Sequence, residues 1–213
     1  NYRNIAADEI TDRAIAWLKS IPGDAPVHLF VNYFDPHDPY TPPKGFDRFP
    51  GARAPLPKAT VNADGTVQLT ARDRSALLAR YDGEILFMDQ QLGRLFDALR
   101  TLDRFEHALI VVTSDHGELF GEHSAQGHGA WLWEEVLKVP LLVHFPGGQD
   151  GGSTNDRPTS LVDILPLGAQ ETGIPLEEPV SGSWDERGRT LYATHEPSRL
   201  LTQVPARDRD LES

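Results

Sequence analysis

The chain has 213 residues, of which 39% are hydrophobic, and this is enough to bury one core of ordinary size. Its 20 Lys and Arg against 32 Asp and Glu give a formal net charge of −12, which argues against a nucleic-acid or anionic-membrane surface because phosphate groups would be repelled. Cysteine is absent, which excludes disulfides, thiolate metal sites and cysteine nucleophiles within these residues.

The first half of the chain alternates predicted elements with loop. Apolar residues recur among charges over residues 5–20 and predict a helix, which a proline-glycine pair ends. The apolar run 27–34 is too short for a core helix and is closed by Pro36, so it predicts a buried strand. Prolines and glycines without periodicity predict a long surface loop over residues 42–64.

The longest predicted helix covers residues 72–102, where an apolar stripe repeats every three or four positions. The stripe consists of Leu77, Tyr81, Ile85, Met88, Leu92, Leu95 and Leu99. Continuously apolar runs at 108–113 and 139–145 then predict two more strands, each covered on both faces. Strand, long helix, strand, short helix and strand in this order predict an α/β fold with a parallel sheet.

The two ends of the chain complete this organisation. A further helix is predicted over residues 160–172 and a last strand over 190–194, before a charged tail. No run of about 18 apolar residues exists, so we expect no membrane span. The chain begins at Asn1, with neither an initiator Met nor a signal peptide, and we expect it to be cut from a larger protein. The compartment stays open, with a periplasmic or secreted location among the options.

Polar side chains gather where the predicted strands end. His37 follows the first strand, Asp115 and His116 follow the second, and His128 lies in the connection to the third. Ligands of open α/β sheets bind beyond the carboxyl ends of the strands. We therefore expect these four side chains to surround one pocket.

Asp115 and His116 are neighbours in the chain, so both can reach one cation only where the backbone bends sharply. Gly117 permits such a bend, since glycine tolerates close or left-handed backbone. The alternative is that Asp115 caps a helix that has Glu118 in its first turn. The position behind a buried strand, together with two other histidine-bearing loops, favours a metal site.

The other two histidines lie in loops of opposite character. His37 lies between two prolines, which stiffen the backbone and suit a ring that donates a hydrogen bond to an anionic oxygen or protonates a leaving group. Its alternative is a turn that faces solvent. His128 lies between two glycines, which let a ligand approach closely, and its alternative is a flexible loop with an incidental histidine.

Four motifs in chain order resemble those of the sulfatase family, a part of the alkaline phosphatase superfamily. They are residues 34–43, where the family has a histidine that contacts sulfate, 81–93 in its core helix, 113–118 at its metal-binding strand end, and 127–141. The resemblance implies an α/β, alkaline phosphatase-like parallel-sheet sandwich whose N-terminal half is absent here. Residues 1–175 would be the C-terminal part of the catalytic domain, and residues 176–213 an extension.

The resemblance also implies roles for the four candidate residues. Asp115 and His116 would hold a divalent cation, most often Ca²⁺ in sulfatases, with Mn²⁺ or Zn²⁺ as alternatives. His37 and His128 would hydrogen-bond the sulfate group or protonate the departing alcohol, and the substrate would be a small-molecule or saccharide sulfate ester. Many family members have Lys where this chain has His128, and a His there also occurs in phosphonate and phosphodiester hydrolases of the superfamily.

The nucleophile of the family has no counterpart in this sequence. It is a formylglycine made from a Cys/Ser-x-Pro-x-Arg motif, and it lies near an early pair of aspartates that completes the metal site. Two ligands cannot hold a hard cation that takes six or more oxygens. We therefore expect formylglycine in an N-terminal part outside these residues, and expect the 213 residues alone to be inactive.

Two alternatives to a sulfatase stay open. The first is a phosphonate monoester or phosphodiester hydrolase on the same scaffold. The second is a non-catalytic binding domain, in which the acidic surface and the proline-rich loop form an interaction face. An incomplete sheet could also pair its edge with a neighbouring chain, so a homo-oligomer is a further expectation.

Overall fold

The computed structural model describes residues 5–55, 60–63, 65–129, 131–177, 180 and 182–184. It forms two compact units, one made of Asn1–Phe105 with Phe120–Gln126 and the other of Glu106–Leu119 with Gly127–Ser213. The strand predicted over residues 190–194 and the charged tail lie outside the described residues.

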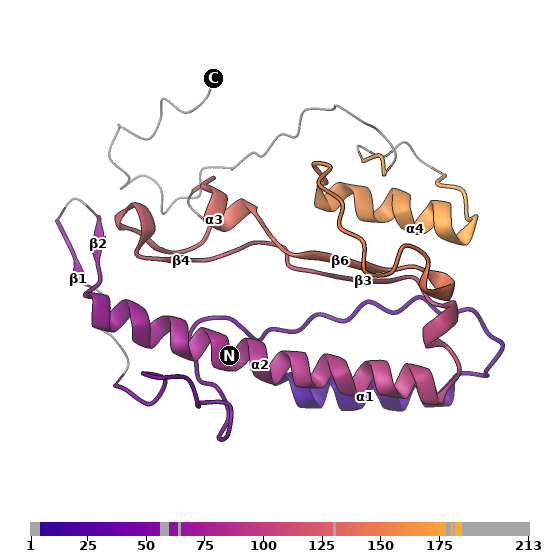
Figure 1. Cartoon of the computed structure of the whole chain (residues 1–213), viewed down its shortest axis with the longest axis horizontal. Helices are drawn as coiled ribbons and strands as arrows, with labels where there is room; N and C mark the ends of the chain where they lie inside the picture. Colours follow the sequence, from indigo (N-terminus) through magenta and orange to yellow (C-terminus); the bar gives the residue numbers. More distant parts are fainter. Residues whose placement is uncertain are drawn as a thin grey trace. The chain divides into compact units, whose positions relative to one another are not determined.

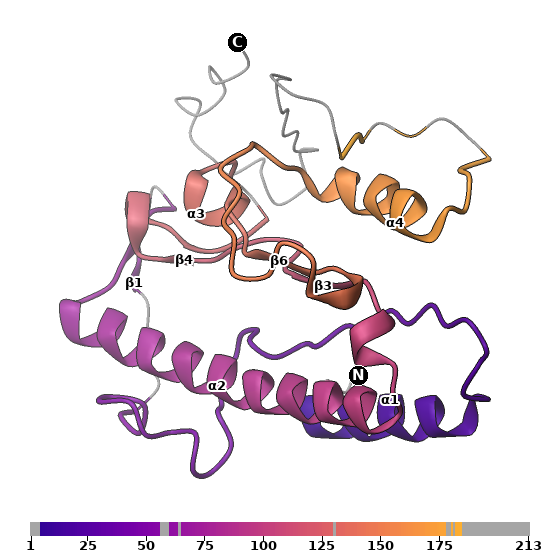
Figure 2. The same cartoon turned by 45° about the vertical axis from the view of Figure 1, so that its right-hand side comes forward.

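Two helices dominate the first unit. Helix α1 (Ala7–Ser20) and helix α2 (Ala71–Thr101) lie side by side, as Figures 1 and 2 show. Thr70 caps the start of helix α2, and its Oγ1 accepts a hydrogen bond from the backbone N–H of Asp73, which satisfies one of the free amides of the first turn. Both helices were predicted from the apolar spacing, and both predictions are confirmed.

The most buried face of α2 is not wholly apolar. It carries Leu77, Glu84, Phe87, Gln91 and Leu95, with Glu84 only 4% and Gln91 only 3% exposed. Most members of the predicted apolar stripe are half-buried instead, on a line beside this face. The predicted buried face of α2 therefore lies beside the observed one. The prediction considered apolar side chains only and left out Glu84 and Gln91.

Residues 27–34 run as an extended segment in the first unit (Figure 1). Val27, Leu29 and Val31 pack against the cluster that joins α1 to α2, whereas Phe30 on the opposite face is 82% exposed. Side chains alternate between the two faces of an extended segment, and the described residues cover one face only. The predicted strand is therefore buried on one side, and within the described ranges it pairs with no other strand.

The loop that follows is held against α2 at a glycine. A Cβ atom at Gly83 would lie 2.7 Å from the carbonyl oxygen of Phe46 and 2.8 Å from Cβ of Pro42, so only glycine allows this approach. Two short strands, β1 (Thr60–Val61) and β2 (Val67–Gln68), then pair antiparallel. This hairpin was not predicted, although the dipeptide Asp-Gly in the sequence between its strands is a common hairpin signal.

The second unit contains the main strand pair. Strands β3 (Ile110–Thr113) and β6 (Leu141–His144) run antiparallel, from Ile110 opposite His144 to Thr113 opposite Leu141. The predicted strands are present, but a parallel pairing was expected. Parallel neighbours need a long crossover, usually a helix, whereas the α-helix between these strands, α3 (Glu134–Leu137), has four residues. The mixture of helices and strands still places the chain in the predicted α/β class.

Short elements complete the described structure. Strand β4 (Leu119–Phe120) pairs with β5 (Gln126–Gly127), around the 3₁₀ turn Glu122–Ser124. Helix α4 (Ile164–Thr172) follows the 3₁₀ turn Leu161–Asp163 and confirms the helix predicted over residues 160–172. No helix in the described part of the chain is both long and apolar enough to cross a membrane.

Candidate functional site

The turn after β3 carries the adjacent pair Asp115 and His116. Residues 114–118 are not helical, which contradicts the alternative that Asp115 starts a helix. The hydroxyl of Ser114 donates to the carbonyl oxygen of His116 at 2.6 Å, and the backbone N–H of His116 donates to Oδ1 of Asp115 at 3.1 Å. These bonds give the turn a local structure of its own.

The atoms of Asp115 and His116 that could bind a metal ion lie close together. Nδ1 of His116 lies 2.8 Å from the carbonyl oxygen of Gly117, and a carbonyl can only accept, so Nδ1 carries the proton. The other ring nitrogen, Nε2, then has the free electron pair, and it lies 3.7 Å from Oδ1 of Asp115. The Asp115 side chain is 87% exposed and the His116 side chain 34% exposed. An open carboxylate and a correctly protonated imidazole side by side suit two ligands of one divalent cation.

Gly117 brings the turn into close contact with the chain around α3. Its N–H donates to the carbonyl oxygen of Val136 at 2.7 Å, and the N–H of Glu118 donates to that of Glu135 at 3.1 Å. A Cβ atom at Gly117 would lie 2.0 Å from the oxygen of Glu135. Of the two reasons that the sequence offered for glycine here, close approach is the one that holds, because Gly117 is not left-handed.

His128 follows β5 directly in the chain and contacts His116. Its ring stacks on that of His116, with centroids 3.9 Å apart and planes tilted by 23°. Its Nδ1 lies 3.3 Å from Oε2 of Glu118, whose side chain is 7% exposed. Gly127 and Gly129 on either side have φ of 91° and 90°, a left-handed conformation that favours glycine. The three predicted residues of this unit therefore meet, and sequence reasoning missed Glu118 as the carboxylate that holds the His128 ring.

This cluster does not enclose a cation by itself. Among the residues that the structure describes, no three His, Asp or Glu side chains are placed to hold a metal ion together. Asp115 and His116 fit one side of a coordination sphere, and a hard cation takes at least six ligands. A complete site would need further oxygen ligands.

His37, the fourth predicted residue, belongs to the first unit. Its Nδ1 donates to the carbonyl oxygen of Asp38 at 2.7 Å, and its ring lies 4.5 Å from that of Phe34, centroid to centroid. The imidazole is therefore held by its neighbours, as the flanking prolines suggested. That His37 shares a pocket with Asp115 and His116 stays a prediction.

The loop that carries His37 is anchored at both ends. At its start, the carboxylate of Asp35 accepts a hydrogen bond from the backbone N–H of Ala7 at 3.0 Å, in the first turn of α1, where helix amides lack partners. At its end, the N–H of Thr41 donates to Oε1 of Glu84 at 2.6 Å. Tyr40, 3% exposed, packs beside Thr41 against the rings of α2 and β4.

Glu84 is an unusual residue for the core face of a helix. Burial raises the pKa of its carboxyl from 4.5 to about 7, and the negative charges of Asp35 and Asp38 add to this rise. The backbone amides of Thr41 and His37 favour the ionised form and oppose the rise. Oε2 is buried and has no hydrogen-bond partner in the described structure.

This raised pKa predicts a pH-dependent stability. Below pH 4.5 both the folded and the unfolded chain hold the proton. Between pH 4.5 and about 7 the folded chain keeps a proton that the unfolded chain has lost, so the stabilisation is lost as pH rises. The free energy of unfolding relative to Glu84→Gln should therefore fall by on the order of 3 kcal/mol from pH 4.5 to 8. Denaturant unfolding of both proteins at several pH values measures this difference in the free energy of unfolding. A difference that stays constant between pH 4.5 and 8 would contradict the prediction.

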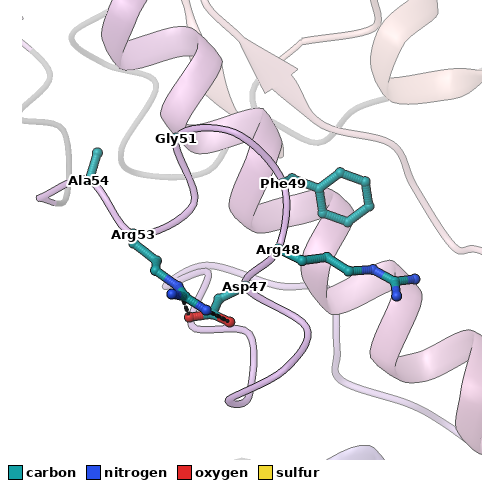
Figure 3. A pocket seen from close by; sticks show the side chains of 6 residues that line it. All are labelled: Asp47, Arg48, Phe49, Gly51, Arg53 and Ala54. Atoms are coloured by element: carbon teal, nitrogen blue, oxygen red, sulfur yellow. Dashed lines mark hydrogen bonds and ion pairs between the residues drawn. The ribbon is translucent and has the colours of Figure 1, made fainter.

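A surface hollow in the 42–55 loop carries none of the predicted site residues. Figure 3 shows Asp47 and Arg53 turned toward each other in it, with Nε–Oδ2 and Nη2–Oδ1 distances of 2.6 and 3.0 Å, while Arg48 points away. The Arg53 hydrogen bond lowers the pKa of Asp47 and so keeps its carboxylate charged. Because this guanidinium is already paired with a carboxylate, the hollow is a poor site for sulfate.

A family profile described as Sulfatase matches residues 2–174 of the chain. The chain belongs to the sulfatase family. The four motifs that suggested this resemblance all lie within the matched residues. Asp115, His116, His128 and His37 are thus parts of a sulfatase-family domain, whatever their individual roles.

Individual sulfatases and related structures agree with the family profile. The chain is 28% identical to an uncharacterised sulfatase, YidJ, of Escherichia coli over 92% of its own length, and 30% identical to arylsulfatase K of Bos taurus over 81%. A phosphonate monoester hydrolase of Agrobacterium radiobacter has a similar structure, with a TM-score of 0.70 and 28% identity over 84% of this chain. These likenesses confirm the predicted fold class, an incomplete α/β domain of the alkaline phosphatase type.

The chain spans about two fifths of the length of these relatives. It covers 41% of the Escherichia coli sulfatase, 37% of arylsulfatase K and 42% of the phosphonate monoester hydrolase. A sulfatase of ordinary length therefore contains more than half of its residues outside the part that corresponds to this chain.

Proposed function

We propose that the whole protein hydrolyses sulfate esters with a bound divalent cation, and that this chain supplies part of the site. The observation that carries the proposal is the cluster after β3, where Oδ1 of Asp115 faces Nε2 of His116 at 3.7 Å and the ring of His128 stacks on His116 at 3.9 Å. It lies in the segment that matches the sulfatase family. A small-molecule or saccharide sulfate ester is the proposed substrate class.

Each residue has a stated task in this proposal. Asp115 and His116 would hold the cation, with Ca²⁺ first and Mn²⁺ or Zn²⁺ as alternatives, and the cation would polarise the ester oxygens. The Glu118 carboxylate accepts the Nδ1–H of His128, so a doubly protonated His128 would donate its Nε2–H to an ester oxygen or to the departing alcohol. His37, with Nδ1 held by its own loop, would present Nε2 in the same way.

The remaining parts of the site would come from outside these residues. The proposal assigns to another segment both the formylglycine nucleophile and the additional oxygen ligands that a hard cation needs. The 213 residues alone should therefore bind Ca²⁺ weakly and turn over no ester. Appreciable sulfatase activity of these residues by themselves would refute this division of the site.

A phosphonate monoester or phosphodiester substrate is the second candidate. The likeness to the phosphonate monoester hydrolase of Agrobacterium radiobacter favours it, since that structure matches 84% of the chain with a TM-score of 0.70. The presence of His128, where many sulfatases have Lys, also favours it.

Two measurements on the whole protein test the proposal. In an ester assay, an aryl sulfate should be hydrolysed with a higher kcat/KM than a phosphonate monoester, and the reverse order would support the second candidate. Calorimetric titration with Ca²⁺ and with Mn²⁺ should release or absorb heat. A protein that gives no heat with either cation and hydrolyses neither ester would be the non-catalytic binding domain instead.

A further inference from the structure

The buried carboxylate of Glu84 contacts the loop that carries His37. Glu84 projects from α2 and is 4% exposed, and its Oε1 accepts the backbone N–H of Thr41 at 2.6 Å. The backbone amide of His37 is close enough to act on the same carboxyl. The carboxyl of Glu84 thus holds the loop at Thr41, four residues after His37.

We propose that Glu84 is a positioning residue, which sets the place of the His37 imidazole by holding the backbone of residues 37–41 against α2. The role rests on the proposed function, because it gives Glu84 a task in ester hydrolysis only if His37 has one. Glu84 itself touches no substrate in this proposal. It acts through the loop.

Helix packing by itself does not account for Glu84. The neighbouring core of α2 is built from Leu77, Phe87 and Leu95, and an apolar side chain would fill the same space without burying a carboxylate. The penalty of that burial is compensated only in part, since Oε2 has no hydrogen-bond partner in the described structure. What the carboxylate provides is an acceptor for the loop amides.

The same helix offers a matched control at Gln91. This residue is as deeply buried as Glu84, at 3% exposed, and it lies two turns further along α2. Its Oε1 accepts from the guanidinium of Arg94 at 2.6 Å, so it holds a side chain of its own helix rather than the loop. Replacing either residue by Met removes a buried acceptor from α2, but only Glu84→Met releases the loop.

The first test is amide hydrogen exchange, which needs no activity. Loss of one hydrogen bond, about 1 kcal/mol, should speed exchange at the Thr41 amide about fivefold in Glu84→Met. The Gln91→Met variant should leave that amide as protected as in the unmodified protein. Equal exchange at Thr41 in the two variants would overturn the proposal.

The second test is kinetic, on the whole protein with an aryl sulfate. Glu84→Met should lower kcat by about 10- to 100-fold with little change in KM, because a displaced His37 is lost chiefly in the transition state. Glu84→Gln keeps an acceptor for Thr41 and should restore most of the rate, and Gln91→Met should keep the full rate. Equal losses in the two Met variants, or no rescue by Gln, would overturn the proposal.

The two tests separate this inference from the proposed function. If the unmodified protein hydrolyses no ester, the proposed function fails and so does the kinetic role of Glu84, while the exchange result still decides whether Glu84 holds the loop. If the protein is active and Glu84→Met keeps its kcat, the positioning role fails and the proposed function stands.

Discussion

Replacing Asp115 by Ala should lower kcat/KM of the whole protein for an aryl sulfate by at least about 10³-fold. A bound cation contributes several kcal/mol of charge stabilisation in the transition state, and each 1.36 kcal/mol is a factor of ten in rate. In the proposed site Asp115 would offer its carboxylate to the cation beside Nε2 of His116, so its loss should remove most of that contribution. Initial rates over a range of substrate and Ca²⁺ concentrations measure the effect.

The exposure of Asp115 makes this prediction specific. Its side chain is 87% exposed, so Asp115→Ala should keep the fold, with circular dichroism unchanged and a melting temperature lowered by only a few degrees for the lost hydrogen bond to His116 N–H. Asp156, an exposed aspartate of the same unit, provides the control, since Asp156→Ala makes the same change in net charge at a residue outside the proposed site. Rates within about tenfold of each other for the two variants would show that Asp115 holds no catalytic cation.

Gly117→Ala should destabilise the second unit by about 3 kcal/mol and weaken cation binding at the proposed site. The added Cβ atom would lie 2.0 Å from the backbone oxygen of Glu135, and backbone cannot turn aside as a flexible side chain can. The turn must therefore move, and the hydrogen bond from Gly117 N–H to Val136 is lost with it. Thermal unfolding should show a fall of roughly 6–12 °C, and calorimetry with Ca²⁺ a loss of heat.

Gly168 in α4 serves as the control for this substitution. A Cβ atom there would meet nothing within 4 Å, and the residue lies in the same unit as Gly117. Gly168→Ala should raise stability by about 0.5–1 kcal/mol, because alanine favours the helix over glycine. If the two alanine variants melt at the same temperature, the close approach at Gly117 is not a constraint on this turn.

Local patterns in the sequence were enough to predict the helices and the proximity of Asp115 and His116. Apolar spacing placed α1, α2 and α4, because a helix repeats over many residues and its stripe is long. Asp115 and His116 are neighbours in the chain, so a sharp turn alone brings their donor atoms together. The stacking of His128 on His116 is a less local event, which depends on the return of the chain through β4 and β5.

These local patterns could not predict which strands pair, in which direction they run, or which polar side chains are buried. An apolar run shows that a strand is buried but carries no information on its partner or direction, which is why β3 and β6 were expected to be parallel. Glu84 was missed for a different reason. A search for apolar periodicity treats a carboxylate as a surface residue. Here the carboxyl of Glu84 is buried because it accepts a hydrogen bond from the backbone amide of Thr41.

The hydrogen bond from Ala7 N–H to Asp35 links the start of α1 to the loop of His37. One carboxylate thus serves two structures at once, as the N-terminal cap of a helix and as the first fixed point of a turn. A library of substitutions at position 35 would consequently report a composite phenotype, in which helix fraying and a relaxed turn arise together. Substitutions meant to change the loop alone should therefore keep Asp35, so that its carboxylate still accepts the hydrogen bond from Ala7.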